Sequence, residues 1–345
     1  MLGKSVKPDK HPVMTKIKPG LLIAVLIFLV ASAVIANLSL GAYQLSISQI
    51  WQTFFGSSTS DAISESVILD IRLPRIILGL AIGIALAGST SLMQTSMRNV
   101  LADPALLGLA AASALGVVVA LVFGFDFGSF AAFIFALIFT VFAFLLLLVG
   151  HFGGTRAASQ NTLVIGVALG SLFLGLLGIL ATTLDNPQLR SMALWSFGSL
   201  SLATQATANI ALVAALVGLL FAWQLAPKLD LLLLGEKAAG LLGVETRKIR
   251  MLALLLISIL VTAAVFGAGV IAFLGLFSVT TARVLVGPRH RALLVTSALV
   301  SALTILVCDL LARTVAAPID LPIGFFTSLI GAPVLITILL RSKSE

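Results

Sequence analysis

Residues 128–150 read GSFAAFIFALIFTVFAFLLLLVG, an apolar run without one charged side chain. A helix of about twenty apolar residues crosses the ~30 Å hydrocarbon core of a bilayer, and this run has that length. Its apolar residues do not alternate with polar ones, as the strands of a membrane barrel require. Since backbone groups in lipid must be satisfied within the chain, the run predicts a membrane-spanning helix.

The rest of the chain repeats this pattern. Of its 345 residues 60% are hydrophobic and only 10% are charged, against about 25% charged in soluble domains. No soluble fold of this length hides so much apolar surface, so we predict an all-α polytopic membrane protein. Hydropathy predicts about ten transmembrane helices, near residues 20–38, 73–95, 105–123, 128–150, 161–183, 205–225, 249–267, 270–285, 291–313 and 321–340.

The predicted organisation is one transmembrane domain over residues 20–341, with a basic tail at 1–19 and a short tail at 342–345. The basic tail followed by an apolar stretch also fits a cleavable signal peptide, but the many later spans favour a retained first helix. The eighth span is short and carries Thr280 and Thr281, so we expect it to lie inside the bundle.

The basic residues predict the orientation. With both termini in the cytoplasm, only four of the 21 Lys and Arg lie outside, as the positive-inside rule expects. The net charge of +8 therefore needs no nucleic acid to explain it. The four outer residues are Arg72, Arg75, Arg190 and Arg313.

Residues that carry chemistry are few and scattered. The single cysteine, Cys308, lies in an apolar run, and His11, His151 and His290 lie in three separate polar segments. No metal site or cofactor is predicted from them, and no phosphate-binding G-x-x-x-x-G-K-[ST] loop occurs. The sequence also lacks an acid/base set, which disfavours an intramembrane enzyme. It lacks charge near the midplane, which disfavours a secondary transporter driven by an ion gradient; that transporter stays the alternative from another class.

Two inner segments differ from ordinary membrane helix. RNVLADPALLG, 98–108, carries an Asn, an Asp-Pro and a Gly that predict a structured turn. LDLLLLGEKAAGLLGVETRKIR, 229–250, is predicted as two helical pieces separated by a Gly break. Its leucines beside Glu236 and Lys237 predict docking on another protein, or else packing beneath the bundle of the same chain. In the fifth span, the GVALG spacing of Gly166 and Gly170 predicts close helix packing.

The outer arginines have more than one interpretation. Complementary charges across an interface steer docking and fix its register, so these cations are candidates for contact with a partner protein. The alternatives are anchoring to lipid headgroups or an internal pair, for example Arg313 with Asp309 one helical turn away.

Five motifs occur in the order and spacing of one known family: RLPR at 72–75, RNVLADPALLG at 98–108, LLGEKAAGLLGV at 233–244, GVIAFLGL at 269–276 and LPIGFFTSLIGAPV at 321–334. The chain thereby resembles the permease subunit of bacterial ABC importers for ferric siderophores, haem and cobalamin. The resemblance implies a type II importer bundle in the cytoplasmic (inner) membrane, and a dimer with a second copy or a paralogous permease. It also implies two ATP-binding subunits inside, a periplasmic or lipid-anchored substrate-binding protein outside and no catalytic residue in this chain.

The resemblance also implies roles for particular residues. A ferric siderophore is the expected cargo, with haem or cobalamin as alternatives. Many members carry a Pro-His pair where this chain has Val279 and Thr280, which fits pairing with a non-identical permease. The residues implied to dock the substrate-binding protein are Arg72, Arg75 and Arg313. The residues implied to couple to the ATPase lie in a segment near 227–248 and are Leu234, Gly235, Glu236, Lys237, Ala238, Gly240 and Gly243. The implied cytoplasmic gate is Ser159 and Gln160, with Asn161 and Thr162 beside them.

Overall fold

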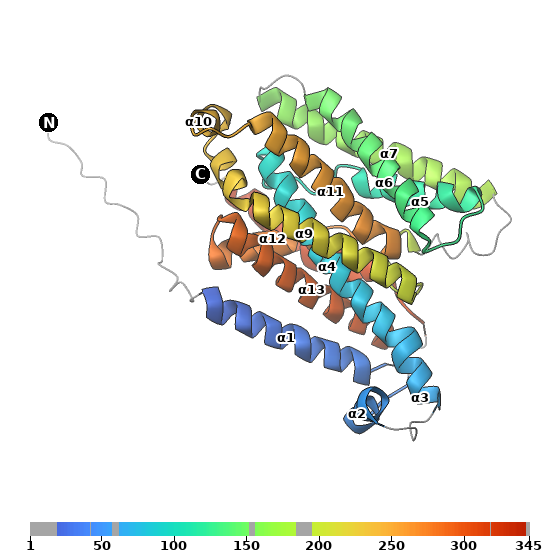
Figure 1. Ribbon diagram of the computed structural model, residues 1–345. Coiled ribbons are helices and arrows are strands. Elements are labelled where there is room, and N and C mark those ends of the chain that lie inside the picture. The colour runs from blue at the N-terminus through green and yellow to red at the C-terminus, as the bar shows by residue number, and fades with distance from the viewer. Residues whose placement is uncertain are drawn as a thin grey trace.

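The structure is a computed structural model that describes residues 19–41, 43–56, 62–151, 156–183, 195–317 and 319–342. Within these ranges the side chains of 149–161, 181–183, 236, 335 and 338–342 are left out of the description. All the regular elements in the described ranges are helices (Figure 1).

The ten predicted spans are confirmed as helices. Seven stretches of the described chain are long and apolar enough to cross a membrane, and three shorter apolar helices occupy the remaining positions. The helices are α1 (Pro19–Ser39), α4 (Leu73–Met97), α5 (Leu109–Val122), α6 (Phe130–His151), α7 (Arg156–Thr183), α9 (Gln205–Leu233), α11 (Thr246–Ala268), α12 (Leu274–Val286), α13 (His290–Thr314) and α14 (Ile323–Ser342).

Four further short elements lie at the ends of the bundle. A π-helix, η1 (Val67–Arg72), joins α3 (Ala62–Ser66) to α4, so that one continuous helical stretch of 36 residues results. The segment α2 (Ile47–Phe55) lies crosswise at the end of α1, and α10 (Glu236–Leu241) lies at the opposite end of the molecule (Figure 1). We call the α10 end the inner end and the α2 end the outer end, following the predicted orientation.

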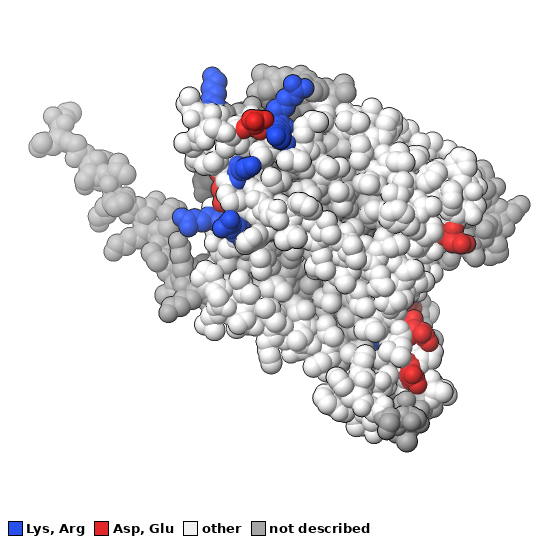
Figure 2. All heavy atoms as spheres, viewed as in Figure 1, with Lys and Arg blue, Asp and Glu red and all other residues white. Residues whose placement is uncertain are grey.

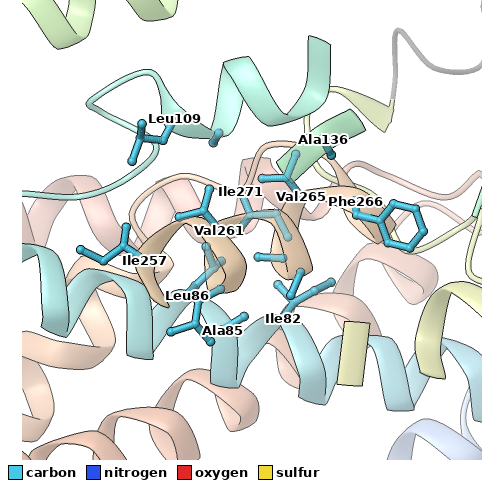
Figure 3. Close-up of a cluster of buried hydrophobic side chains, with 14 of the residues drawn as sticks. Ile82, Ala85, Leu86, Leu109, Ala136, Ile257, Val261, Val265, Phe266 and Ile271 are labelled. Carbon is cyan, nitrogen blue, oxygen red and sulfur yellow. The ribbon is translucent and has the colours of Figure 1, made fainter. Parts of the chain in front are cut away.

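Helix α4 lies at the centre of the bundle and packs against α9, α11, α12 and α13. Its close contacts depend on small residues: a Cβ added at Gly83 would lie 2.6 Å from the Cα of Ala302 in α13. Small residues at helix interfaces let backbones approach closely, which membrane bundles use in place of a hydrophobic driving force. Beside this contact, Ile82 and Leu86 of α4 and Val261 of α11 belong to one cluster of buried apolar side chains (Figure 3).

The loop before α5 and the middle of α7 are in close contact. Gly108 has a φ of +76°, and a Cβ there would lie 2.6 Å from the backbone nitrogen of Gly170 and 2.8 Å from the carbonyl oxygen of Gly166. The close packing predicted for GVALG is therefore confirmed. Its partner is the loop motif 98–108, not another helix midpoint.

The eighth span, α12, is partly enclosed. Val279 is fully buried among Ala282 and Leu293, whereas Thr280 and Thr281 are half-buried. Seen from one side, Lys and Arg gather around the inner end while Asp and Glu predominate at the outer end (Figure 2). This polarity is the charge distribution expected of a chain that obeys the positive-inside rule.

Candidate functional site

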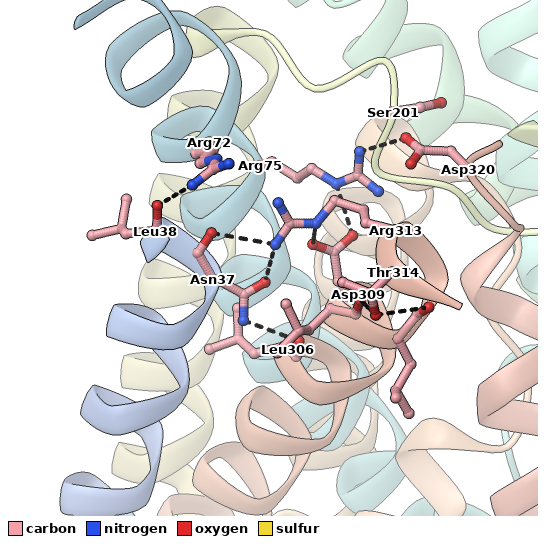
Figure 4. A network of polar contacts seen from close by, with 12 residues as sticks. Asn37, Leu38, Arg72, Arg75, Ser201, Leu306, Asp309, Arg313, Thr314 and Asp320 are labelled. Carbon is pink, nitrogen blue, oxygen red and sulfur yellow. Dashed lines mark hydrogen bonds and ion pairs between the residues drawn. The ribbon is translucent and has the colours of Figure 1, made fainter. Parts of the chain in front are cut away.

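Buried polar groups form an outer network where α1, α4 and α13 end. Arg75 of α4 is its centre: its Nε lies 2.7 Å from Oδ1 of Asp309 in α13, and its Nη1 lies 2.8 Å from Oδ2 of Asp320 before α14. The Nε of Arg313 lies 3.2 Å from Oδ2 of Asp309, one turn away. Asp309 therefore forms ion pairs with two guanidinium groups at once (Figure 4).

The network extends to α1 through Asn37. Nη2 of Arg313 donates to Oδ1 of Asn37 at 2.6 Å, and Nδ2 of Asn37 donates to the carbonyl oxygen of Leu306 at 3.1 Å. The guanidinium of Arg72 donates to the carbonyl oxygens of Leu38, in the last turn of α1, and of Tyr43, just after that helix. These bonds fix the outer end of the first helix to the central bundle (Figure 4).

The three predicted docking arginines thus lie together, but they do not extend from the surface. Arg72 and Arg75 are buried, and Arg313 is nearly so. A cation removed from water needs acceptors, and Asp309 and Asp320 supply them within the chain. The internal pair of Arg313 with Asp309, one of the alternatives from the sequence, is present. The docking role itself stays a prediction, since a single chain does not test it.

Asp70, next to these arginines in sequence, takes no part in the network. It is exposed, and its Oδ2 accepts a hydrogen bond of 2.8 Å from the hydroxyl of Ser66. Asp320 and Asn37, in contrast, belong to the network and were missed. They lie 245 and 276 residues from the arginines that they contact, so no local pattern could have indicated them.

A second polar cluster, which we call the inner joint, links α4, α9 and α13 near the inner end. Nδ1 of His290 lies 2.6 Å from Oδ1 of Asp230, and the backbone N–H of His290 donates to the same oxygen at 2.9 Å. On the other side of the ring, Nε2 lies 2.6 Å from Oγ1 of Thr95. None of these residues was singled out as functional from the sequence.

The loop motif 98–108 is a structured turn, as predicted. Asn99 and Asp103 each accept a backbone N–H two residues on, from Leu101 and Ala105, both at 2.9 Å. Asp103 also accepts from the hydroxyl of Thr90 at 3.2 Å and is fully enclosed. Burial raises the pKa of the Asp103 carboxyl, and these hydrogen bonds oppose that shift.

The predicted coupling segment contains α10, bounded by two glycines in left-handed conformation. Gly235 has a φ of +109° and Gly243 a φ of +80°. Leu234 and Lys237 are exposed, and Leu241 is 90% exposed, while Ala239 packs inward. The structure therefore presents an apolar, solvent-facing tip and not a segment packed beneath its own bundle. Of the remaining residues, Gly240 lies on the exposed side, Ala238 is half-buried, and the side chain of Glu236 lies outside the description.

The predicted gate residues begin α7. The side chains of Ser159, Gln160 and Asn161 lie outside the described part of the structure. Thr162 is buried. Farther along α7, a cavity of about 620 Å³ opens between this helix, the segment before α12 and the start of α14. Its lining is mainly apolar, with Leu177 from α7 and the ring pair Phe197–Phe325, whose centroids are 6.4 Å apart.

The sequence profile of the FecCD transport family matches residues 26–341 of this chain. The chain belongs to that family. As a FecCD protein it is similar to the hemin transport system permease protein HmuU of Yersinia pestis, with 37% identity covering 96% of this chain and 98% of the relative. It is also 34% identical to the vitamin B12 import system permease protein BtuC of Vibrio vulnificus, covering 88% of this chain and 91% of the relative.

Two further comparisons agree with this assignment. The iron(3+)-hydroxamate import system permease protein FhuG of Bacillus subtilis is 32% identical, covering 94% of this chain and 98% of the relative. A solved structure, described as an inward-facing conformation of a metal-chelate type ABC transporter, matches with a TM-score of 0.79 and 30% identity. That match covers 94% of this chain and 100% of the other. The predicted type II importer permease fold is thereby confirmed.

Proposed function

We propose that this FecCD protein is the permease subunit of an ATP-driven importer that moves an iron chelate inward across the cytoplasmic membrane. The observation that carries the proposal is α10. It is a short, glycine-bounded helix with exposed leucines, at the end of the bundle where basic residues gather. Contiguous exposed apolar side chains outside the bilayer mark a protein interaction site. Two ATP-binding subunits are the proposed partners there, and a second permease completes the transporter.

The proposed cargo is a bulky preformed chelate. The three named relatives are permeases for hemin, vitamin B12 and iron(3+)-hydroxamate, which supports this substrate class. A ferric siderophore remains the proposed cargo. Haem is the second candidate, because the cavity beside α7 is mainly apolar and carries two neighbouring phenyl rings. Planar apolar ligands are well accommodated by such linings.

The outer network is proposed as the platform for a substrate-binding protein. Its support is position: Arg72, Arg75 and Arg313 cluster at the outer end, and Asp320, a partner of Arg75, is 38% exposed. A carboxylate on a partner protein can therefore reach this edge and compete with Asp320 for Arg75. Ser159, Gln160, Asn161 and Thr162 at the start of α7 are proposed as the cytoplasmic gate. Pairing with a non-identical permease is proposed because this chain has Val279 and Thr280 where many family members carry a Pro-His pair.

Reconstitution tests the function. The permease, its ATPase subunits and its binding protein are placed in liposomes, and uptake of a radio-iron hydroxamate siderophore, haemin and cobalamin is measured with and without ATP. We expect uptake of an iron chelate that requires both ATP and the ATPase subunits. Uptake that continues without the ATPase and stops with an ionophore would instead identify a secondary transporter.

A further inference from the structure

One carboxylate at the inner end holds two helices together. Oδ1 of Asp230, on α9, accepts both the backbone N–H and the Nδ1–H of His290, at 2.9 and 2.6 Å. His290 is the first residue of α13, and the preceding Arg289 makes no side-chain cap. Asp230 therefore caps α13 from a different helix, where the unpaired N–H groups and the positive end of the helix dipole favour an anion.

The imidazole of His290 also contacts a third helix through its other nitrogen. Nε2 of the ring lies 2.6 Å from Oγ1 of Thr95 on α4, and the same hydroxyl donates within its own helix to the carbonyl oxygen of Ser91 at 3.1 Å. His290 is buried, so this bond is shielded from competing water. The chain of contacts Asp230–His290–Thr95 thus connects α9, α13 and α4 near the inner end.

Asp230 lies close to α10 in the chain, which links the inner joint to the predicted coupling segment. Asp230 lies three residues before the end of α9, and α10 begins at Glu236. Because only two residues separate α9 from α10, a displacement of α10 by a bound partner acts directly on the turn of α9 that carries Asp230. A cavity of about 260 Å³ beside the joint, lined by Thr95, His290 and Leu293, leaves space for that turn to move.

We propose that Asp230, His290 and Thr95 form the joint through which movement of α10 reaches α4 and α13. His290 is the positioning residue of this joint and contacts neither ATP nor cargo. The inference rests on the proposed function for its consequence in transport, but its physical content, the linkage of three helices by one carboxylate and one imidazole, is independent of the cargo.

The first test separates coupling from stability. In the reconstituted transporter, with radio-iron hydroxamate siderophore and haemin as probes, His290→Ala is expected to lower uptake per ATP hydrolysed at least tenfold. ATP hydrolysis itself should stay within about twofold of the parent protein. Thr95→Val, which keeps the side-chain shape, should cause the same loss, because it breaks the link to α4 alone. Asp230→Asn retains the acceptor oxygen and should preserve most coupling.

The control is Asp126→Asn, a matched loss of one carboxylate at an exposed position in the loop between α5 and α6. It should leave uptake per ATP unchanged. If His290→Ala keeps the parent ratio of uptake to hydrolysis, or lowers both in proportion, the joint is refuted.

A second test uses the full-length chain alone in nanodiscs and does not depend on transport. Hydrogen exchange is measured in the first turn of α13 and in the last turn of α4. Asp230→Ala should accelerate exchange at least tenfold in both places, because the effect must pass through His290 to Thr95. Acceleration confined to α13 would overturn the inference. Absence of ATP-dependent uptake by the parent transporter, with both turns affected here, would refute the proposed function while supporting the joint.

Discussion

The two ends of α4 and α13 are held together by different kinds of contact. At the outer end, three arginines share two aspartates and several carbonyl oxygens, and each guanidinium has at least two partners. At the inner end, one histidine bridges one carboxylate and one hydroxyl. Loss of one bond leaves the outer end still cross-linked, whereas at the inner end it breaks the polar link from α9 through His290 to α4. The same helix pair therefore has redundant polar contacts outside and a single chain of polar contacts through His290 inside.

The largest expected effect comes from breaking the outer end. Asp309→Leu leaves Arg75 without its buried carboxylate and Arg313 without its ion-pair partner. Removing one partner of a buried pair costs about 3–5 kcal/mol. We expect most of the protein to be lost to unfolding, measured as thermal stability and folded yield in detergent. Asp126→Asn serves as the control and should match the parent; a stable Asp309→Leu protein would show that the outer end is not held by these ion pairs.

The next largest effect is expected at the inner tip. Gly235→Pro imposes a φ near −65° on a residue that needs +109°. The link from α9 to α10 must then reorganise, and we expect uptake by the reconstituted transporter to fall at least tenfold while ATP hydrolysis continues. Gly20→Pro, in the first turn of α1, provides a comparison at a position where an added Cβ meets nothing within 4 Å. Normal uptake by the Gly235 variant would count against the coupling role of α10.

A smaller effect concerns the buried carboxyl of the 98–108 turn. Because the native pKa of Asp103 is raised, the folded state binds its proton more tightly than the unfolded chain does. The resulting stability is present below the unfolded pKa near 4 and is lost as pH rises through the native value. Asp103→Asn keeps an acceptor for the backbone N–H of Ala105 and removes this dependence of stability on pH. We expect the thermal stability of the variant to fall less than that of the parent as pH rises from 4 to 7. Melting curves from pH 4 to 7 would show it; an unchanged pH dependence would contradict the assignment.

The smallest effect tests whether the outer end is also a docking surface. Asp320→Asn removes a half-exposed ion-pair partner of Arg75, a loss of about 0.2–1 kcal/mol that the bond to Asp309 offsets. If a partner carboxylate competes for Arg75, the variant should bind the substrate-binding protein about threefold more tightly at low salt. Titration of labelled binding protein measures this. Arg75→Glu is a poor test, because it would place three carboxylates together in a buried site. Unchanged or weaker binding would argue against competition.

Local signals in the sequence predicted the helices and the loops and turns between them. The apolar runs predicted the ten spans. The glycines on either side of α10 and the Asp-Pro pair of the 98–108 turn are local signals for the chain reversals found there. For the outer arginines the sequence left several interpretations open, because topology shows which end they occupy and not which acidic groups lie within reach. Asp309 and Asp320 lie 234 and 245 residues from Arg75 in the sequence, so only the tertiary fold brings them together. The pairing of His290 with Asp230, 60 residues apart, has the same origin.

The π-helix η1 accommodates one extra residue ahead of α4. The backbone N–H of Leu73 bonds to the carbonyl oxygen of Ile68, five residues back, so the turn holds one residue more than an α-helical turn. Deleting one residue of 67–72 would let the stretch close as ordinary α-helix, and α2 and α3 would keep nearly the same direction. Deleting one residue from the α-helical turns of α4 that follow would instead rotate all that precedes it by about 100° around the helix axis. The outer face of the protein therefore tolerates a shorter η1 and does not tolerate a shorter α4.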